Sequence, residues 1–423
     1  MVEKQESVSN YYYEKYGELI NSWYMNHLLD LGIINTGIKA EGATITDSKG
    51  NIFIDCTSGF GLGNLGHNNP VIVEAIIDQL RKKEVNTRPF INKNQIELAE
   101  LLKNITPDKL ECSYLFNSGS EAIESAIKLV RLYKGQKKII SMKNSFHGFT
   151  LGALSASGVA SFRKPYEPLL PGFEQLEFDN FEELNRLNDK EVGALLIEPI
   201  QHDAGIRIPS KKYLQEIRKL CDEKNIILIF DEVITGIGKT GYMFASDYFQ
   251  VIPDIMVIGK SLGAGLIPVG AIITNKNLWQ RFGLSFPMSA TSYGGNSLAC
   301  RTAIESIKFI QSNNILNSVR EKGLIISDQL NQMMNNYPDI ILSFSGIGLM
   351  FGIEIINNNI AFEIVRGLVK KNIIVYQSFG NANIIMLEPP LVITTEQILR
   401  VINGFKEVLA KQHSKNVTMK SNP

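Results

Sequence analysis

A lysine at the end of an apolar strand is the first residue of this sequence that could do chemistry. Lys260 follows the apolar run Ile255–Ile258 and precedes a glycine-containing loop at residues 261–265. We expect its amine to point into a crevice that excludes water. Burial disfavours the ammonium form and lowers the pKa of a lysine, which yields a nucleophile able to form a Schiff base with a carbonyl. A solvated surface charge is the other interpretation of a lone lysine at such a position.

A carboxylate and an aromatic ring stand near two other strand ends. Asp231 follows the apolar run 226–230, and Phe146 comes shortly after the run 138–142. A carboxylate there either caps the local structure or holds a pyridine nitrogen protonated, so that the ring can accept the electrons of a carbanion. The phenyl ring either stacks on an aromatic ligand or belongs to the core.

A short serine and glycine segment is suited to binding phosphate. Ser118, Gly119 and Ser120 precede the helical pattern of residues 122–133. Backbone N–H groups at a helix N-terminus bind anions, and the helix dipole favours negative charge there. Any N-capping serine would look similar. Together, however, a phosphate cradle, a stacking ring, a ring-nitrogen partner and an imine-forming lysine are what pyridoxal 5'-phosphate requires of a protein.

The elements that must position these residues are short strands that alternate with helices. Near-continuous apolar runs are typical of strands buried on both faces of a mostly parallel sheet covered by helices. Because ligands of such sheets bind beyond the carboxyl ends of the strands, we expect one site at that edge. The runs that end in polar residues are 113–116, 138–142, 192–197, 226–230 and 254–259.

The later part of the chain predicts a smaller α/β domain. A helical pattern at residues 302–311 continues towards Tyr337, and residues 346–355 and 373–376 are strand-like. We therefore predict an α/β protein in three parts. Residues 1–50 form a segment that packs with the small domain or a partner, residues 51–310 the large cofactor-binding domain, and residues 311–423 the small C-terminal domain.

Composition excludes several classes of function. The 423 residues carry 43 Lys+Arg and 43 Asp+Glu, so a balanced charge argues against nucleic acid or an anionic membrane as the main partner. The N-terminus lacks the basic and apolar regions of a signal peptide, and no apolar run is long enough to span a membrane. The four cysteines and five histidines stand apart, without metal-ligand spacing. We expect a cytoplasmic protein with reduced thiols and no metal.

Two short motifs are similar to nucleotide-binding motifs, but each lacks a feature that nucleotide binding requires. Residues 61–66 match GxGxxG, but no helix opens directly after them as a dinucleotide site requires. The triplet at residues 238–240 is similar to the end of a P-loop, but Val233 stands where a P-loop needs glycine. We interpret residues 61–66 as a glycine-containing loop that another part of the backbone can approach closely.

The full set of motifs resembles, in order, that of the class-III aminotransferases, which are pyridoxal-phosphate enzymes of fold type I. Residues 53–70, 162–173 and 387–391 look most similar to the putrescine/ornithine-type branch. The matching segments are residues 116–122 (FNSGSEA), 145–148 (SFHG), 198–201 (EPIQ), 231–241 (DEVITGIGKTG), 260–265 (KSLGAG), 292–296 (SYGGN) and 389–391 (PPL).

The resemblance implies a role for each site residue. Lys260 would carry the Schiff base and move the proton, and Asp231 would pair with the pyridinium nitrogen. Phe146 and Val233 would pack against the two faces of the ring. Gly119 and Ser120, next to Ser118, would bind the phosphate.

The resemblance also implies a homodimer with shared sites. In the family, a threonine just before the aromatic-Gly-Gly-Asn segment completes the phosphate site of the partner subunit. This chain has Ser292 at that position and Thr291 beside it.

The departures from the family concern the substrate. Three positions that commonly hold a carboxylate-binding arginine are Met386, Phe149 and Gln377 here, and Ile234 stands where a glutamine is common. Without those arginines, the bidentate grip on a substrate carboxylate is lost. The site should then suit a diamine, an aminoalkyl compound, or an aldehyde or ketone on a carrier.

The expected reaction is a ping-pong transfer of an amino group from an amine donor to an aldehyde or keto acceptor. An amino-acid or keto-acid partner would still need a cation, which Arg88 or Arg207 could supply. Two alternatives stay open at this point. The same cofactor supports decarboxylation, epimerisation or elimination, because it stabilises the same carbanion. The second alternative is a binding protein without activity, and the presence of Lys260 and Asp231 argues against it.

Overall fold

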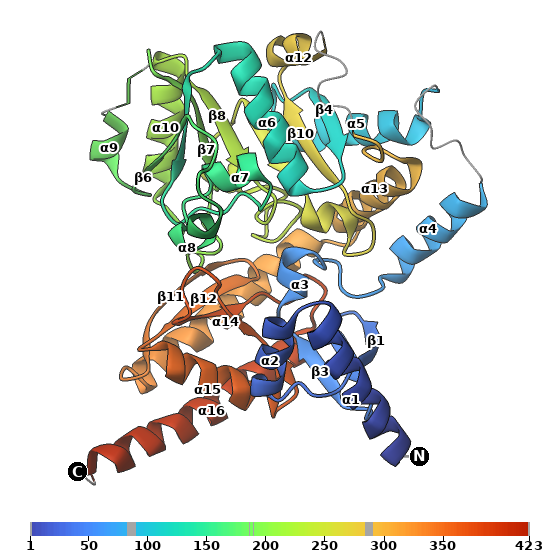
Figure 1. The fold of residues 1–423 in the computed structure, drawn as a ribbon, viewed down its shortest axis with the longest axis vertical. Helices are drawn as coiled ribbons and strands as arrows, with labels where there is room; N and C mark the ends of the chain where they lie inside the picture. Colours follow the sequence, from blue (N-terminus) through green and yellow to red (C-terminus); the bar gives the residue numbers. More distant parts are fainter. Residues whose placement is uncertain (1, 83–89, 186, 189, 284–290, 422–423) are drawn as a thin grey trace.

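The computed structural model describes residues 2–82, 90–185, 187–188, 190–283 and 291–421. Figure 1 shows two lobes, one above the other. The upper lobe contains a seven-stranded sheet in the order β4-β10-β9-β8-β7-β5-β6. Its strands are β4 (Cys112–Phe116), β5 (Lys138–Met142), β6 (Phe173–Leu176), β7 (Val192–Ile197), β8 (Ile227–Asp231), β9 (Ile255–Ile258) and β10 (Gly270–Thr274).

The direction of the strands confirms the mostly parallel sheet. Strand β10 runs antiparallel to both of its neighbours, β4 and β9, and the pairs β9–β8, β8–β7, β7–β5 and β5–β6 are parallel. The five strands that the apolar runs predict therefore end at one edge of the sheet. The sequence pattern did not identify β6 or β10.

Helices cover both faces of this sheet because successive strand side chains point to opposite sides. Leu195 and Leu228 belong to the apolar cluster that contains Leu214 of helix α10, whereas Leu196 and Ile229 belong to the cluster of helix α6. The helices of the upper lobe are α4 (Pro70–Arg81), α5 (Lys93–Ile105), α6 (Gly119–Lys134), α7 (Leu151–Ala156), α8 (Ala160–Arg163), α9 (Phe181–Asn185), α10 (Lys211–Glu223), α11 (Ala245–Phe249), α12 (Lys276–Gly283) and α13 (Ser297–Ser312).

The lower lobe is built from both ends of the chain. One four-stranded sheet has the order β1-β2-β3-β13, in which β13 from the C-terminal part pairs in parallel with β3. A second four-stranded sheet has the order β11-β12-β15-β14. The strands are β1 (Gly37–Glu41), β2 (Thr44–Asp47), β3 (Ile52–Asp55), β11 (Ile341–Ile347), β12 (Met350–Ile355), β13 (Ile373–Ile374), β14 (Tyr376–Gln377) and β15 (Ile384–Leu387).

The predicted strand-like stretch 346–355 contains the last two residues of β11, a turn and all of β12. Strands β11 and β12 pair antiparallel and turn at Gly348, whose φ of +59° belongs to the left-handed region that glycine tolerates. The helical pattern that follows residue 302 forms two helices, α13 and α14. The helices of the lower lobe are α1 (Val2–Leu19), α2 (Ser22–Leu31), α14 (Ile315–Asn336), α15 (Asn358–Val369) and α16 (Thr395–Ser421).

The N-terminal helices lie beside the C-terminal part of the chain in Figure 1. The ring of His27 in α2 lies 6.3 Å from the ring of Phe362 in α15. The division into domains at residues 50 and 310 stays a prediction. None of the helices in the described part of the chain has the length and apolar character that a bilayer crossing requires.

Candidate active site

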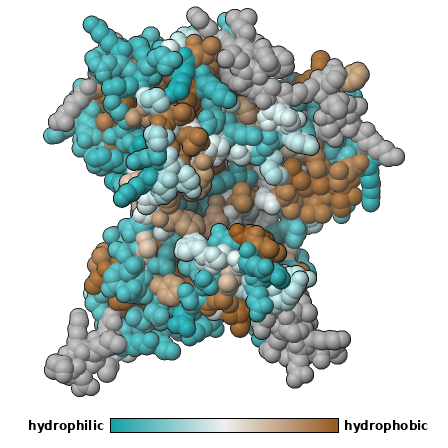
Figure 2. Space-filling model, in the orientation of Figure 1, coloured by the Kyte–Doolittle hydropathy of each residue, from teal (hydrophilic) through white to brown (hydrophobic). Residues whose placement is uncertain are grey.

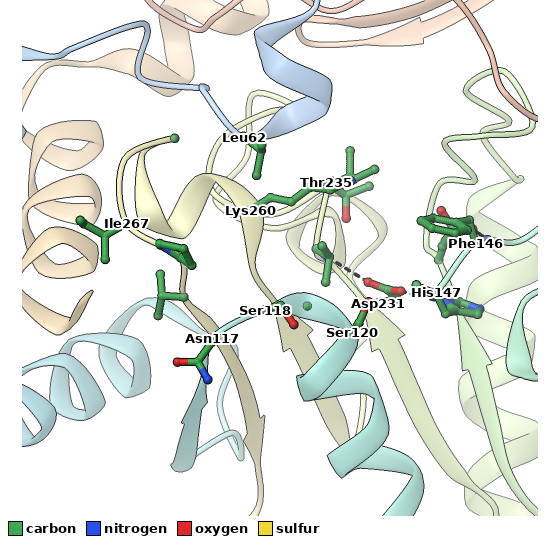
Figure 3. Close-up of a pocket in the computed structure, with 18 of the residues that line it drawn as sticks. Leu62, Asn117, Ser118, Ser120, Phe146, His147, Asp231, Thr235, Lys260 and Ile267 are labelled. Carbon is green, nitrogen blue, oxygen red and sulfur yellow. Dashed lines mark hydrogen bonds and ion pairs between the residues drawn. The ribbon is translucent and has the colours of Figure 1, made fainter. Parts of the chain in front are cut away.

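A cavity of about 390 Å³ opens at the carboxyl edge of the large sheet (Figure 3). Side chains from the ends of β4, β5, β7, β8 and β9 line it, as expected for ligand sites of parallel sheets. Seven of the nine predicted site residues lie in its wall. These are Ser118, Gly119, Ser120, Phe146, Asp231, Val233 and Lys260.

The N-terminus of helix α6 forms the lower wall of the cavity in Figure 3. Ser118 is the N-cap, and its hydroxyl accepts a hydrogen bond from the N–H of Glu121. The next two N–H groups, of Gly119 and Ser120, have no acceptor among the described residues. These two free donors and the dipole of a 16-residue helix are available to an anion in the cavity.

Position 119 has no room for a side chain. A Cβ built on Gly119 would lie 2.9 Å from both methyl carbons of Val233. Any larger residue would separate the start of helix α6 from the loop after strand β8. Glycine therefore keeps Val233 and the two free N–H groups in the wall of the same cavity.

Asp231 is buried and held in place by two donors. Its Oδ2 lies 2.8 Å from Nδ1 of His147, and its Oδ1 accepts from the N–H of Val233 at 3.1 Å. His147 is fully packed, and its Nε2 has no partner among the described residues. With two oxygens fixed in this way, the carboxylate can act as a stationary counter-charge for a cation in the cavity.

Lys260 extends into the cavity from the end of strand β9 (Figure 3). Its φ of +44° is left-handed, a conformation that costs energy in a residue with a side chain. Burial lowers the pKa of its amine, and the nearby carboxylates of Asp203, Glu388, Asp231 and Glu198 oppose that shift. The amine is therefore easier to deprotonate than a lysine in water, which a nucleophilic lysine requires.

Phe146 lies next to His147 and apart from Lys260 (Figure 3). Its ring lies 4.9 Å from that of Phe149 and 5.7 Å from that of Phe162. Glu198 fixes the Phe146 backbone, since its carboxylate accepts from the Phe146 N–H at 2.8 Å. Burial raises the pKa of Glu198 to about 7, although His147 lowers it.

Thr291 and Ser292 do not line this cavity. The hydroxyl of Thr291 accepts from Nδ2 of Asn117 at 2.7 Å, and Ser292 is exposed. The structure therefore brings together seven of the predicted residues and places the half-buried Thr291 and the exposed Ser292 outside the cavity wall.

The positions without arginine have other roles in the fold. Met386 is completely buried in the core, and Gln377 donates to the carbonyl of Ala382 at 2.6 Å. Ile234 lines the cavity. Arg207 lies over the ring of Phe178 at 5.5 Å and is not in the cavity wall. Arg88 lies outside the described residues.

Sequence reasoning assigned no role to two residues that the structure places at the site. His147 pairs with Asp231, and Glu198 supports Phe146. Both belong to motifs that follow predicted strands, at residues 145–148 and 198–201. Their position after strand ends was therefore the available signal, but which carboxylate His147 meets depends on the pairing order of the strands.

The fold and the site define a transaminase of fold type I that depends on pyridoxal 5'-phosphate. A model of the family "aminotransferase class-III" matches residues 33–409. The chain therefore belongs to the class-III aminotransferases, as the resemblance of its motifs indicates.

Solved structures of related enzymes have the same fold. A transaminase from the marine bacterium Virgibacillus is 26% identical, with a TM-score of 0.84 over 90% of this chain and 94% of that one. An ornithine aminotransferase from Toxoplasma gondii, with pyridoxal phosphate at partial occupancy in its active site, is 27% identical, with a TM-score of 0.84 over 90% and 92%. The acetylornithine aminotransferase from Elizabethkingia anophelis is 28% identical, with a TM-score of 0.77 over 89% and 94%.

The residues present fit this cofactor. The cavity has the size of a small-molecule site, two free N–H groups suit a phosphate, and a buried carboxylate suits a pyridinium nitrogen. When bound, the cofactor supplies an electron sink that stabilises negative charge on the substrate carbon.

The pairing of His147 with Asp231 can be tested through cofactor affinity. Replacing His147 by Ala leaves the buried carboxylate without its ring donor. A hydrogen bond to a charged group contributes about 1.5–3 kcal/mol, so we expect the dissociation constant for pyridoxal phosphate to rise roughly 10- to 150-fold. The measurement is an absorbance titration of apoprotein. His413→Ala, which removes a partly exposed ring beside Asp339, is the control and should leave the constant unchanged. Equal affinity of His147→Ala and wild type would contradict this role.

Proposed function

We propose that this transaminase takes its amino group from an amine that has no carboxylate near the reacting nitrogen. The single observation that carries the proposal is the charge of the cavity wall. Among the described residues that line it, Lys260 is the only lysine or arginine, whereas Asp231 and Glu198 are acidic. A carboxylate of the substrate would find no bidentate partner there.

The aromatic and aliphatic lining supports the same substrate class. Phe146 and Val233 line the cavity together with Ile200, Ile234 and Leu266. Such a wall suits the methylene chain of a diamine or aminoalkyl compound. Donor and acceptor would react in turn at the same site, the acceptor being an aldehyde or keto compound.

Each site residue has a proposed role in this reaction. Lys260 would hold the cofactor when no substrate is present and move the proton at the substrate carbon. Asp231 would keep the ring nitrogen protonated. Phe146 and Val233 would contact the ring from two sides, and the N–H groups at the start of α6 would bind its phosphate.

We further propose that a second copy of the chain completes the phosphate site with Thr291 or Ser292. Tyr293 next to them is 75% exposed, and Phe90 and Ile91 are 71% and 86% exposed. Asn92 donates to the carbonyl of Gly295 at 3.3 Å, so these apolar side chains belong to one region of the surface. Figure 2 shows a further apolar area where helix α4 lies in Figure 1. Extended apolar surface of this kind is typical of a protein interface.

The substrate proposal predicts which amines convert the cofactor. Purified protein with pyridoxal phosphate should have a yellow absorption band, and 1,4-diaminobutane should bleach it, because amino transfer to the cofactor removes the conjugated imine. Glutamate and alanine should bleach it at least about tenfold more slowly, since each lost charge-assisted contact costs about 1.5–3 kcal/mol. Lys260→Ala should show no turnover. Bleaching by the amino acids alone would contradict the proposal, because a cation outside the cavity wall would then have to bind the carboxylate.

The shared site predicts complementation between two inactive variants. Lys260→Ala lacks the nucleophile, and a double change of Thr291 and Ser292 to Ala removes the hydroxyls offered to the partner. Each homodimer should be inactive or nearly so. A mixed dimer should regain activity, because one of its two sites then has an intact Lys260 and intact hydroxyls from the other subunit. Mixtures that stay as inactive as the parents, despite confirmed subunit exchange, would refute the shared site.

A further inference from the structure

A completely buried lysine contacts segments from both ends of the chain. Lys239 lies in the loop that follows strand β8. Its Nζ donates to the carbonyls of Glu388 and Pro389 at 2.9 and 3.0 Å. It also donates to the hydroxyl of Ser58 at 3.3 Å. The three N–H bonds of an ammonium therefore meet three oxygens, as a buried charge requires.

One of these segments is a left-handed turn. The four residues of α3 (Ser58–Gly61), which Figure 1 shows between the lobes, have φ angles of +48°, +58°, +60° and +83°. Two of them, Ser58 and Phe60, carry side chains, for which this conformation is unfavourable because Cβ crowds the following carbonyl oxygen. The turn therefore needs contacts from outside itself to keep this conformation.

Two side chains of the turn make such contacts. The hydroxyl of Ser58 accepts from Lys239 and donates to the carbonyl of Glu388 at 2.5 Å. The ring of Phe60 packs edge-on against the ring of Tyr376, with 4.8 Å between their centroids. Lys239 therefore joins the turn, the segment after strand β15 and the loop after strand β8 at one point.

The turn and the residues that follow it pack against Lys260 and its loop. A Cβ built on Gly61 would lie 3.7 Å from Cδ of Lys260. A Cβ built on Gly265, in the loop after Lys260, would lie 3.2 Å from Cα of Gly63. Leu62, between the two glycines of this segment, lines the cavity together with Lys260 (Figure 3). The position of the turn therefore limits the positions open to the aliphatic part of Lys260.

We propose that Lys239 is a positioning residue for Lys260, because its ammonium holds the left-handed turn against the aliphatic part of the reacting lysine. The inference rests on the proposed role of Lys260. No covalent bond forms or breaks at Lys239, and its protons stay on Nζ. Burial lowers the pKa of Lys239 to about 8, although the charges of Glu388 and Asp55 oppose that shift, so the ammonium is the main form at pH 7.

Hydrogen–deuterium exchange of the full-length protein loaded with pyridoxal phosphate, followed by peptide mass spectrometry, tests this role. Lys239→Met keeps an unbranched side chain and removes its three donors. Peptides covering residues 57–66, where the N–H groups of Phe60 and Gly63 bond within the segment, should exchange at least about tenfold faster, since bonds to a charged donor are lost. Peptides covering residues 259–267 should also exchange faster, because they pack against this segment. Peptides of helix α10 should not change.

Lys322→Met is the matched control. The amine of Lys322 donates to the carbonyl of Leu391 at 3.3 Å, so it bonds the same C-terminal segment but no described residue of α3. We expect this variant to leave both peptides unchanged. If Lys239→Met does not fold, Ser58→Ala removes the hydroxyl that Lys239 bonds and should speed the exchange of both peptides to a smaller extent.

Kinetics add a measurement that a general loss of structure would not reproduce. In Lys239→Met, the turnover number with 1,4-diaminobutane should fall at least about tenfold, because the reacting lysine is misplaced. The dissociation constant for pyridoxal phosphate should stay within about twofold, since the amine of Lys239 bonds neither helix α6 nor Asp231 among the described residues.

Three results of the exchange measurement would overturn the proposal. They are unchanged exchange of residues 57–66, faster exchange of residues 57–66 without any change at residues 259–267, and equally faster exchange of helix α10. The exchange measurement needs no substrate, so it decides on the role of Lys239 even if the amine proposal fails. That failure would instead appear as a yellow band that no amine bleaches.

Discussion

The site depends on one half-buried lysine amine, on which burial and nearby carboxylates act in opposite directions. Burial makes the amine of Lys260 a better nucleophile, but an ammonium in the same place would be costly. Carboxylates near the amine limit that cost, and they act on its pKa in the opposite direction to burial. The balance between these two effects sets the reactivity of the site. The other residues of the site hold these charges in position.

The fold brings the required groups together through close backbone contact. A Cβ built on Gly259, the last residue before Lys260, would lie 3.2 Å from both the N and the Cα of Gly119. The end of strand β9 and the start of helix α6 are therefore in contact, and two glycines make this possible. As a result, the lysine and the free N–H groups for a phosphate open into one cavity.

Much of this arrangement could be predicted from the sequence, because its signals are local. Apolar runs followed by polar residues predict the strand ends, and Ser118 before a helical pattern predicts the cap of α6. The parallel direction of five strands then places Lys260, Asp231 and Phe146 at one edge. The resemblance to class-III aminotransferases gave the same residues and was confirmed by the family comparison.

The rest could not be predicted because it depends on contacts between distant segments. Strand β10 is an apolar run like the others, but its antiparallel place between β4 and β9 follows from pairing and not from its own residues. Likewise, His147 meets Asp231 and His202 meets Glu388 only because the sheets and lobes bring them together. The assignment of Thr291 and Ser292 to a partner subunit needs a second chain and stays a prediction.

The most direct test of the central claim is to find which lysine bonds the cofactor. Lys239 is the main alternative to Lys260 as the lysine that bonds the cofactor. It is completely buried, and burial lowers its pKa to about 8 despite the opposing charge of Glu388. Its amine, however, donates to the carbonyls of Glu388 and Pro389 and does not line the cavity. Borohydride reduction of the yellow protein followed by peptide mass spectrometry would locate the attached pyridoxyl group. We expect it on the peptide that contains Lys260. Attachment to Lys239 or to any other lysine would contradict the assignment of Lys260 as the nucleophile.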